Sequence, residues 1–298
     1  MPLKKPKKKV RFNEDSETKK EQKEKRNGVP DFRIYGVRKE EDFMVLDREL
    51  PRPLETIVEK NGGVIALFAP PGSGKSNFIS NLLLRDDFFK DLFVGGLYII
   101  SPTIENDLTS AHLKKYADFT STEYSEELVG AIFNNILEQD KDERELSCLL
   151  LDDCLGQIKQ HSICNRIAST CRHNKQVVIF SLQALKGLPP TIRSNVSHSI
   201  IFYQPSTKQL NDIVELHSNM GGEDTFKALY EEATAQKYGF LFCDWRDMKA
   251  YKWGSDLPEP IEIWSRYDEN GDINKNVEKI SKVGDEGGGI KEEPKPKK

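Results

Sequence analysis

Short apolar runs alternate with longer amphipathic segments through most of the chain. The runs are typical of buried strands and occur at 43–46, 64–68, 97–100, 148–152, 177–181 and 199–203. Helical periodicity predicts helices over 54–60, 75–84, 125–138, 156–173, 207–217 and 225–235. Because strands made of continuous apolar residues are buried on both faces, we expect an α/β fold, with a mostly parallel sheet covered by helices on both faces.

The last two apolar runs have a different arrangement. Residues 240–243 and 249–253 flank the polar segment 244–247, which predicts an antiparallel hairpin at the C-terminal edge of the sheet. Both ends of the chain are polar. We therefore predict a disordered charged arm over 1–31, one α/β domain over 32–267 and a disordered polar tail over 268–298.

Composition narrows the class of protein. Charged residues make up 31% of the 298 residues, and no apolar run approaches the roughly 20 residues of a membrane span. The five cysteines lack the spacing of a disulfide framework, and no apolar segment typical of a signal peptide follows the first residues, so we expect reduced thiols in an intracellular protein. The net charge is −4, yet basic residues gather between Lys4 and Arg11. This basic arm is a solvated tail, a nuclear-import signal or a nucleic-acid tether.

The segment Ala69-Pro70-Pro71-Gly72-Ser73-Gly74-Lys75-Ser76 joins a predicted strand to a predicted helix. A phosphate-binding P-loop (Walker A motif) needs this context, and Ala69 stands where its pattern has a first glycine. Glycines let the backbone curl and point N–H groups at phosphate oxygens, and the helix N-terminus adds partial positive charge. We expect Lys75 to reach the β- and γ-phosphates of ATP and Ser76 to hold Mg²⁺. The predicted nucleotide contacts are Pro71, Gly72, Ser73, Gly74, Lys75, Ser76 and Asn77.

Two further predicted strands end in polar residues. Asp152 and Asp153 end the strand at 148–152, and Gln183 follows the strand at 177–181. Because ligands of open α/β sheets bind at the carboxyl ends of the strands, we assign Asp152 to Mg²⁺, the Walker B role, and Asp153 to the attacking water. Gln183 would sense the γ-phosphate. Considered alone, the two acids are also explained by an ordinary turn after a strand, and the glutamine by a cap on the following turn.

Two arginines are candidates for a site shared between subunits. Arg172 precedes the strand at 177–181, and Arg193 follows Pro189-Pro190. In ring ATPases an arginine from the neighbouring subunit stabilises charge in the transition state, so either residue is a candidate catalytic group. Surface solvation or a salt bridge explains each arginine equally well.

Cysteines and histidines follow the second acid, at Cys154, His161, Cys164, Cys171 and His173. No Cys-x-x-Cys pair occurs among them, and the cysteines fit one face of a helix packed on the core. We therefore do not expect a zinc site.

Taken in order, these segments resemble a known family. The order is the P-loop, Leu149-Leu150-Leu151-Asp152-Asp153, Cys171-Arg172-His173-Asn174-Lys175, Ser181-Leu182-Gln183 and Leu188-Pro189-Pro190-Thr191-Ile192-Arg193-Ser194-Asn195. This succession resembles the poxvirus-type genome-packaging ATPases of large DNA viruses and virophages, within the FtsK–HerA branch of P-loop NTPases. The resemblance covers about residues 54 to 245.

The resemblance implies a RecA-like P-loop NTPase fold in which the strand that bears Gln183 lies between the P-loop strand and the Asp152 strand. It implies an Mg²⁺-dependent ATPase that drives double-stranded DNA, without sequence preference, into a preformed capsid. The partners would be capsid or portal-vertex proteins, and the assembly a homo-oligomeric ring, with a hexamer favoured. Arg172 would be the arginine finger. Many relatives carry Glu where this chain has Asp153, which is one methylene shorter.

We therefore expect an ATP-hydrolysing motor that translocates viral double-stranded DNA. It would work in the host cell, in a cytoplasmic viral factory or the nucleus, or in the virion. Two alternatives stay open: another P-loop enzyme such as a helicase or a nucleotide kinase, and a nucleotide-gated, non-catalytic assembly protein. Replacing Asp153 or Gln183 distinguishes the assembly protein from a motor, because a non-catalytic scaffold would keep functioning whereas a motor would stall.

Overall fold

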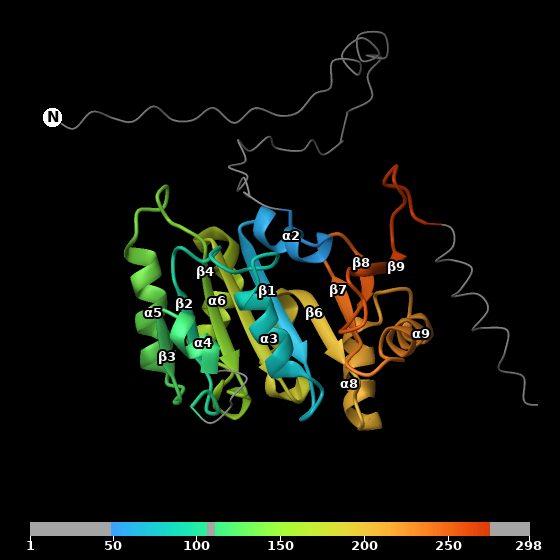
Figure 1. The fold of residues 1–298 in the computed structure, drawn as a ribbon, viewed down its shortest axis with the longest axis horizontal. Helices are drawn as coiled ribbons and strands as arrows, with labels where there is room; N and C mark the ends of the chain where they lie inside the picture. The colour runs from blue at the N-terminus through green and yellow to red at the C-terminus, as the bar shows by residue number, and fades with distance from the viewer. Residues whose placement is uncertain (1–48, 106–110, 275–298) are drawn as a thin grey trace, which may run out of the picture. The chain divides into compact units, whose positions relative to one another are not determined.

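The computed structural model describes residues 49–105 and 111–274. Within these residues nine strands form one sheet in the order β3-β2-β4-β5-β1-β6-β7-β8-β9 (Figure 1). The strands are β1 (Gly62–Phe68), β2 (Leu97–Ile100), β3 (Phe119–Ser121), β4 (Ser147–Asp152), β5 (Gln176–Leu182), β6 (Val196–Phe202), β7 (Phe240–Asp244), β8 (Lys249–Trp253) and β9 (Ile261–Ser265).

The sheet is mixed. The strands from β3 to β6 pair in parallel, and β6, β7, β8 and β9 pair in antiparallel fashion. The predicted α/β class and the hairpin of β7 and β8 are confirmed. β5 pairs with β1 on one side and β4 on the other, so the strand order implied by the family resemblance is confirmed as well.

Helices cover both faces of the sheet. They are α2 (Arg52–Glu59), α3 (Lys75–Leu84), α4 (Ala111–Tyr116), α5 (Glu126–Glu138), α6 (Ile163–Thr170), α7 (Pro190–Asn195), α8 (Thr207–His217) and α9 (Glu223–Ala233). Residues of β1 alternate between two hydrophobic cores: Ile65 and Leu67 pack with α2, α3 and α4, whereas Ala66 and Phe68 pack with the helices from α5 to α9. No helix in 49–105 or 111–274 is long and apolar enough to cross a membrane.

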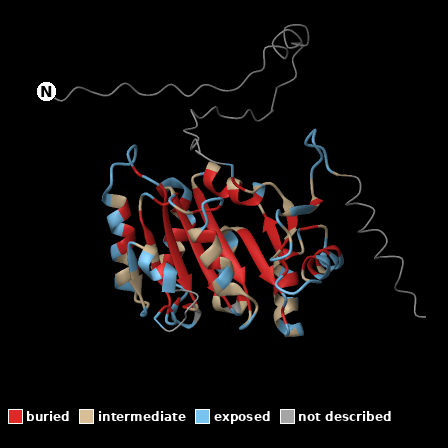
Figure 2. Ribbon diagram, in the orientation of Figure 1, coloured by how far each residue is buried: buried red, intermediate tan, exposed pale blue. Residues whose placement is uncertain are grey.

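The central strands are apolar because no face of them meets water. All seven residues of β1 and all seven of β5 are buried, as the red strands of Figure 2 show. A continuous apolar run is what a parallel strand between two helical layers requires. Consequently, the only places where these strands offer polar groups to a ligand are their ends.

The predicted helix over 156–173 is wrong. The chain instead forms a short 3₁₀ helix η1 (Leu155–Gln157), then α6, then a second 3₁₀ helix η2 (Cys171–Asn174). Ser162 caps α6 by accepting a hydrogen bond from the backbone N–H of Cys164, so the helix starts at Ile163, seven residues later than predicted. The predicted packing face is present, since Cys164, Ile167 and Cys171 lie in the core.

Several short elements lack a predictive pattern. α4, β3, α7 and β9 were not expected, and β9 turns the C-terminal hairpin into a three-stranded antiparallel group. Pairing continues to a bridge between Tyr267 and Ile273. The predicted strand at 43–46 lies outside the described residues, as do the charged arm and the last 24 residues of the predicted tail. The predicted domain bounds stay a prediction.

Candidate nucleotide-binding site

The P-loop joins the end of β1 to the start of α3. Gly72 and Gly74 have φ of 79° and 96°, the left-handed region that side chains disfavour, so this turn requires glycine at both positions. A Cβ on Gly74 would lie 3.2 Å from the ring of Tyr238. At Ala69 the backbone N–H still donates to Leu182 O at 2.9 Å, as a continuation of the strand. Alanine therefore fits at the position where the P-loop pattern has its first glycine.

The two acids lie beside Lys75. Its Nζ is 3.0 Å from Asp152 Oδ1 and 2.6 Å from Asp153 Oδ2. Burial opposes the charged form of Lys75, but the attraction of the two carboxylates outweighs it and raises the pKa of the lysine. Lys75 is therefore cationic at neutral pH and lies where phosphate oxygens would meet it.

Asp153 has an uncommon backbone. Its φ of 52° lies in the left-handed region, where Asp and Asn are found more often than Glu. Its backbone N–H donates to Ser181 O at 3.2 Å, and its Oδ1 accepts a hydrogen bond from Gln183 Nε2 at 3.3 Å. This geometry gives a physical reason for Asp at this position, where the family resemblance leads one to expect Glu.

Asp152 fits a role in holding Mg²⁺. Its Oδ2 accepts a hydrogen bond from Ser101 Oγ at 2.9 Å, whereas its buried Oδ1 has only the ion pair with Lys75. Mg²⁺ prefers carboxylate, hydroxyl and phosphate oxygens, so Asp152 and Ser76 offer suitable groups beside the P-loop. The rest of the coordination would come from phosphate and water.

The other predicted nucleotide contacts differ in exposure. Pro71 and Gly72 are exposed. Ser73 Oγ is buried without a hydrogen-bond partner, which leaves it able to bind a phosphate oxygen. Asn77 lies in the first turn of α3, and its backbone and side-chain oxygens both accept from Asn81 Nδ2.

Arg172 and Arg193 do not join this cluster. Arg172 lies in η2, which precedes β5, and Arg193 lies in α7, which precedes β6. Both thus lie at the amino ends of the parallel strands, whereas the P-loop lies at the carboxyl ends. A seven-residue strand is roughly 20 Å long, so neither arginine is placed to serve its own chain's P-loop.

Sequence reasoning missed Ser101. Ser101 directly follows β2 at the same sheet edge. Its hydroxyl donates a hydrogen bond to Asp152 Oδ2 and is also hydrogen-bonded to Thr103 Oγ1 at 3.2 Å. The rule that pointed to Asp152 and Gln183, a polar residue at the end of an apolar strand, applies to Ser101 as well.

The cysteines are core residues. Cys148, Cys154, Cys164, Cys171 and Cys243 are all buried and free of disulfides. Burial, together with the nearby Asp152, raises the pKa of Cys154 to about 12, so this thiol is neutral at physiological pH. Among the described residues, no group of three or more His, Cys, Asp and Glu side chains is arranged to hold a metal.

A family model described as "Poxvirus A32 protein" matches residues 58–229. The uncharacterized protein 075L of Invertebrate iridescent virus 6 is 28% identical over 209 residues, which cover 66% of this chain and 77% of the relative. The genome packaging NTPase B204 from Sulfolobus turreted icosahedral virus 2, in complex with sulfate, is 15% identical with a TM-score of 0.47, covering 67% of this chain and 98% of that chain. EssC (ATPases 2 and 3) from Geobacillus thermodenitrificans is 16% identical with a TM-score of 0.47, covering 75% of this chain and 44% of that chain.

Proposed function

Because the chain belongs to the poxvirus A32 protein family, we propose that it is a genome-packaging ATPase, which hydrolyses Mg²⁺-bound ATP to drive viral double-stranded DNA into a capsid. The family resemblance drawn from the sequence motifs is confirmed by the match over residues 58–229. The observation that carries the proposal is the contact of Lys75 with both Asp152 and Asp153, at 3.0 and 2.6 Å, next to a glycine-dependent P-loop. The side chain of Lys75 is 12% exposed and lies at the N-terminus of α3, where a bound phosphate would meet both the lysine and the helix end.

Binding comes from the P-loop and the start of α3. The backbone N–H groups around Gly72 and Gly74 and the N-terminus of α3 attract phosphate, and Lys75 leaves the carboxylates to pair with the β- and γ-phosphates. Asp152 and Ser76 would hold the magnesium. Mg²⁺ bound there would neutralise charge that develops on the phosphates during hydrolysis.

Hydrolysis depends on Asp153. Once Lys75 pairs with phosphate, Asp153 Oδ2 is able to accept a hydrogen bond and then a proton from the attacking water. The hydrogen bond from Gln183 Nε2 to Oδ1, 3.3 Å long, orients the carboxylate and brings the amide close to the γ-phosphate. Gln183 thereby links the presence of the γ-phosphate to the position of the base.

Arg172 or Arg193 completes the site of a neighbouring subunit. Both arginines lie at the amino ends of the parallel strands, which supports this role. In a ring, the amino ends of one subunit's strands are able to face the carboxyl ends of the next subunit's strands, where the P-loop lies.

The finer parts of the proposal are a hexameric ring, contacts to DNA phosphates without base recognition, a capsid or portal-vertex partner, and action in the infected cell or the virion.

The proposal is tested by the ATPase rate of the purified full chain, with and without long double-stranded DNA of two unrelated sequences. We expect DNA of either sequence to raise the rate, and Lys75→Ala to abolish hydrolysis. Lys60→Ala is the matched control, since Lys60 is also paired with an aspartate, Asp247, but lies before β1 at the other sheet edge. Hydrolysis that ignores DNA would argue against a translocase.

A further inference from the structure

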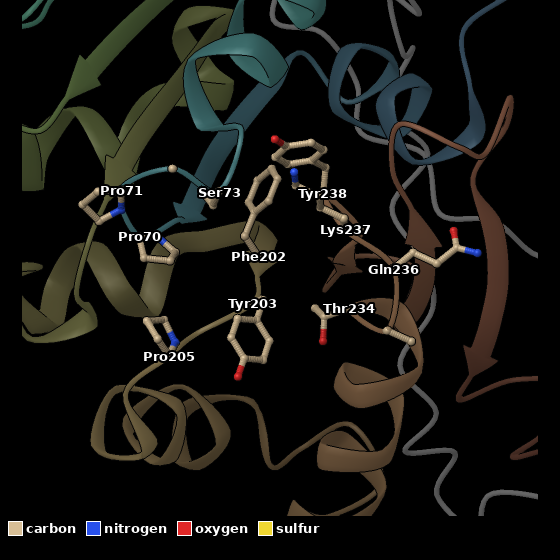
Figure 3. Close-up of a pocket in the computed structure, with 13 residues that line it drawn as sticks. Pro70, Pro71, Ser73, Phe202, Tyr203, Pro205, Thr234, Gln236, Lys237 and Tyr238 are labelled. Carbon is tan, nitrogen blue, oxygen red and sulfur yellow. The ribbon is translucent and has the colours of Figure 1, made fainter.

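A cavity of about 410 Å³ lies beside the P-loop. Three segments far apart in the sequence line it: Pro70 to Ser73 of the P-loop, the residues Phe202, Tyr203 and Pro205 at the end of β6, and 234–239 after α9. Figure 3 shows the P-loop prolines on one side, the 234–239 segment on the other, and Phe202 and Tyr203 between them. A molecule whose phosphates lie on the P-loop would extend directly into this cavity.

Two tyrosines present their rings here. Tyr203 follows β6 and Tyr238 precedes β7, and both strands are buried. Even so, Tyr203 is 61% exposed and Tyr238 is 44% exposed. The Tyr238 ring lies against the P-loop, at 3.2 Å from where a Cβ on Gly74 would be. An exposed aromatic ring next to a phosphate site offers a face on which a flat heterocycle stacks.

The turn that carries Tyr238 is tightly constrained. Tyr238 has φ of 63°, a left-handed conformation that a bulky side chain adopts only when its surroundings hold it there. The next residue has to be glycine, because a Cβ on Gly239 would lie 2.6 Å from Ala233 O. Gly239 N–H also donates to Gln236 O at 3.0 Å. The turn thus fixes the backbone of Tyr238 close to the P-loop, where its ring lies next to Gly74.

The lining has little with which to distinguish one base from another. In the described part of the chain, no Asp or Glu side chain lines the cavity. Thr234 Oγ1 already donates to Tyr230 O at 2.7 Å, and Figure 3 shows the amide of Gln236 directed away from the cavity. Lys237 Nζ lies 4.9 Å from the centroid of the Tyr238 ring. The walls of the cavity are therefore mainly apolar and aromatic.

We propose that this cavity takes the base of the nucleotide, that Tyr203 and Tyr238 hold it by stacking, and that the site accepts purine nucleoside triphosphates with weak selectivity between ATP and GTP. The inference rests on the proposed function, since it assumes that the P-loop holds the phosphates. It adds two things to that function: the residues that bind the base, and the class of nucleotide that serves as substrate.

The test is the Kd of the full chain for ATP, GTP and inorganic tripolyphosphate in Mg²⁺, measured by calorimetry. We expect Tyr203→Ala and Tyr238→Ala each to raise the Kd for both nucleotides about tenfold, as loss of one base–aromatic contact implies. The Kd for tripolyphosphate, which has no base, should stay unchanged. Tyr203→Phe and Tyr238→Phe should bind like the wild type, because they keep the ring.

Tyr267→Ala is the matched control. Tyr267 is 42% exposed, similar to Tyr238, but lies outside the cavity lining. We expect it to bind both nucleotides normally. Unchanged Kd values in both tyrosine-to-alanine variants, a preference for ATP over GTP above a hundredfold, or failure of the wild type to bind either nucleotide would overturn the inference. If nucleotides bind through the tyrosines but are not hydrolysed, the proposed function fails and this inference stands.

Discussion

Replacing Asp153 by Asn tests the role of the second acid. Asn has nearly the same shape, tolerates the left-handed backbone at φ 52° and is able to keep a hydrogen bond with Gln183. It removes only the negative charge 2.6 Å from Lys75 Nζ and the ability to accept a proton from water. The substitution therefore separates chemistry from folding.

The expected magnitudes follow from the geometry. At 2.6 Å and an effective dielectric constant of about 20, the gross attraction is about 6 kcal/mol, but desolvation offsets most of it. Since Asp152 still pairs with Lys75 at 3.0 Å, we expect the free energy of unfolding to fall by about 1 kcal/mol. A positioned general base contributes about 10²- to 10⁴-fold, so kcat should fall by that factor. The KM for ATP should stay constant or fall, because a negative charge next to the phosphates is lost.

The assay is steady-state ATP hydrolysis in the presence of DNA, with thermal unfolding measured on the same preparations. Asp152→Asn is the comparison, and there we expect a higher Mg²⁺ requirement as well as a lower kcat, because that carboxylate is assigned to the metal. Asp153→Glu should be only partly active, since Glu is less suited to the left-handed backbone. If Asp153→Asn keeps kcat within threefold of the wild type, Asp153 is not the base.

Three other substitutions give independent tests. Burial lowers the pKa of His217 to about 4, so below pH 6.5 the unfolded chain binds a proton that the folded chain does not. The free energy of unfolding should therefore fall by about 3 kcal/mol from this residue between neutral pH and pH 4, and chemical denaturation should show that His217→Phe removes this loss. Gly74→Ala should raise the Kd for ATP at least tenfold, because φ at Gly74 is 96°, whereas Gly130→Ala, in the middle of α5 with open space around it, should leave the Kd unchanged. If Arg172 acts on a neighbouring subunit, Arg172→Ala and Lys75→Ala proteins, each inactive, should regain ATPase activity when mixed; no recovery at any ratio would count against Arg172 as the shared group.

The central strands and the P-loop could be predicted because their patterns are local. An apolar run between helices defines β1, and a glycine-rich turn before an amphipathic run defines α3, whose predicted bounds of 75–84 match the structure. The carboxyl ends of adjacent parallel strands meet at one edge, so Asp152 and Gln183 could be placed near Lys75 before the structure was known. Their roles in hydrolysis remain predictions.

Other features depend on tertiary contacts that no local pattern shows. The break before α6 occurs at Ser162, whose hydroxyl is hydrogen-bonded to the distant Tyr124 as well as capping the helix, and the left-handed backbone of Asp153 is set by its contacts with β5. Tyr203 and Tyr238 come together with the P-loop only because β6 pairs with both β1 and β7. In sequence they are two aromatic residues at the ends of strands, and nothing in their immediate neighbours points to a nucleotide.

The most direct test of the central claim, movement along double-stranded DNA driven by ATP, is displacement of a third strand from a DNA triplex. We expect the wild type with ATP to release the third strand whatever the sequence of the duplex that leads to the triplex, and to leave the two duplex strands paired. Lys75→Ala with ATP, and the wild type with a non-hydrolysable ATP analogue, should release nothing. ATP hydrolysis without release would contradict a translocase, and separation of the duplex strands would indicate a helicase instead.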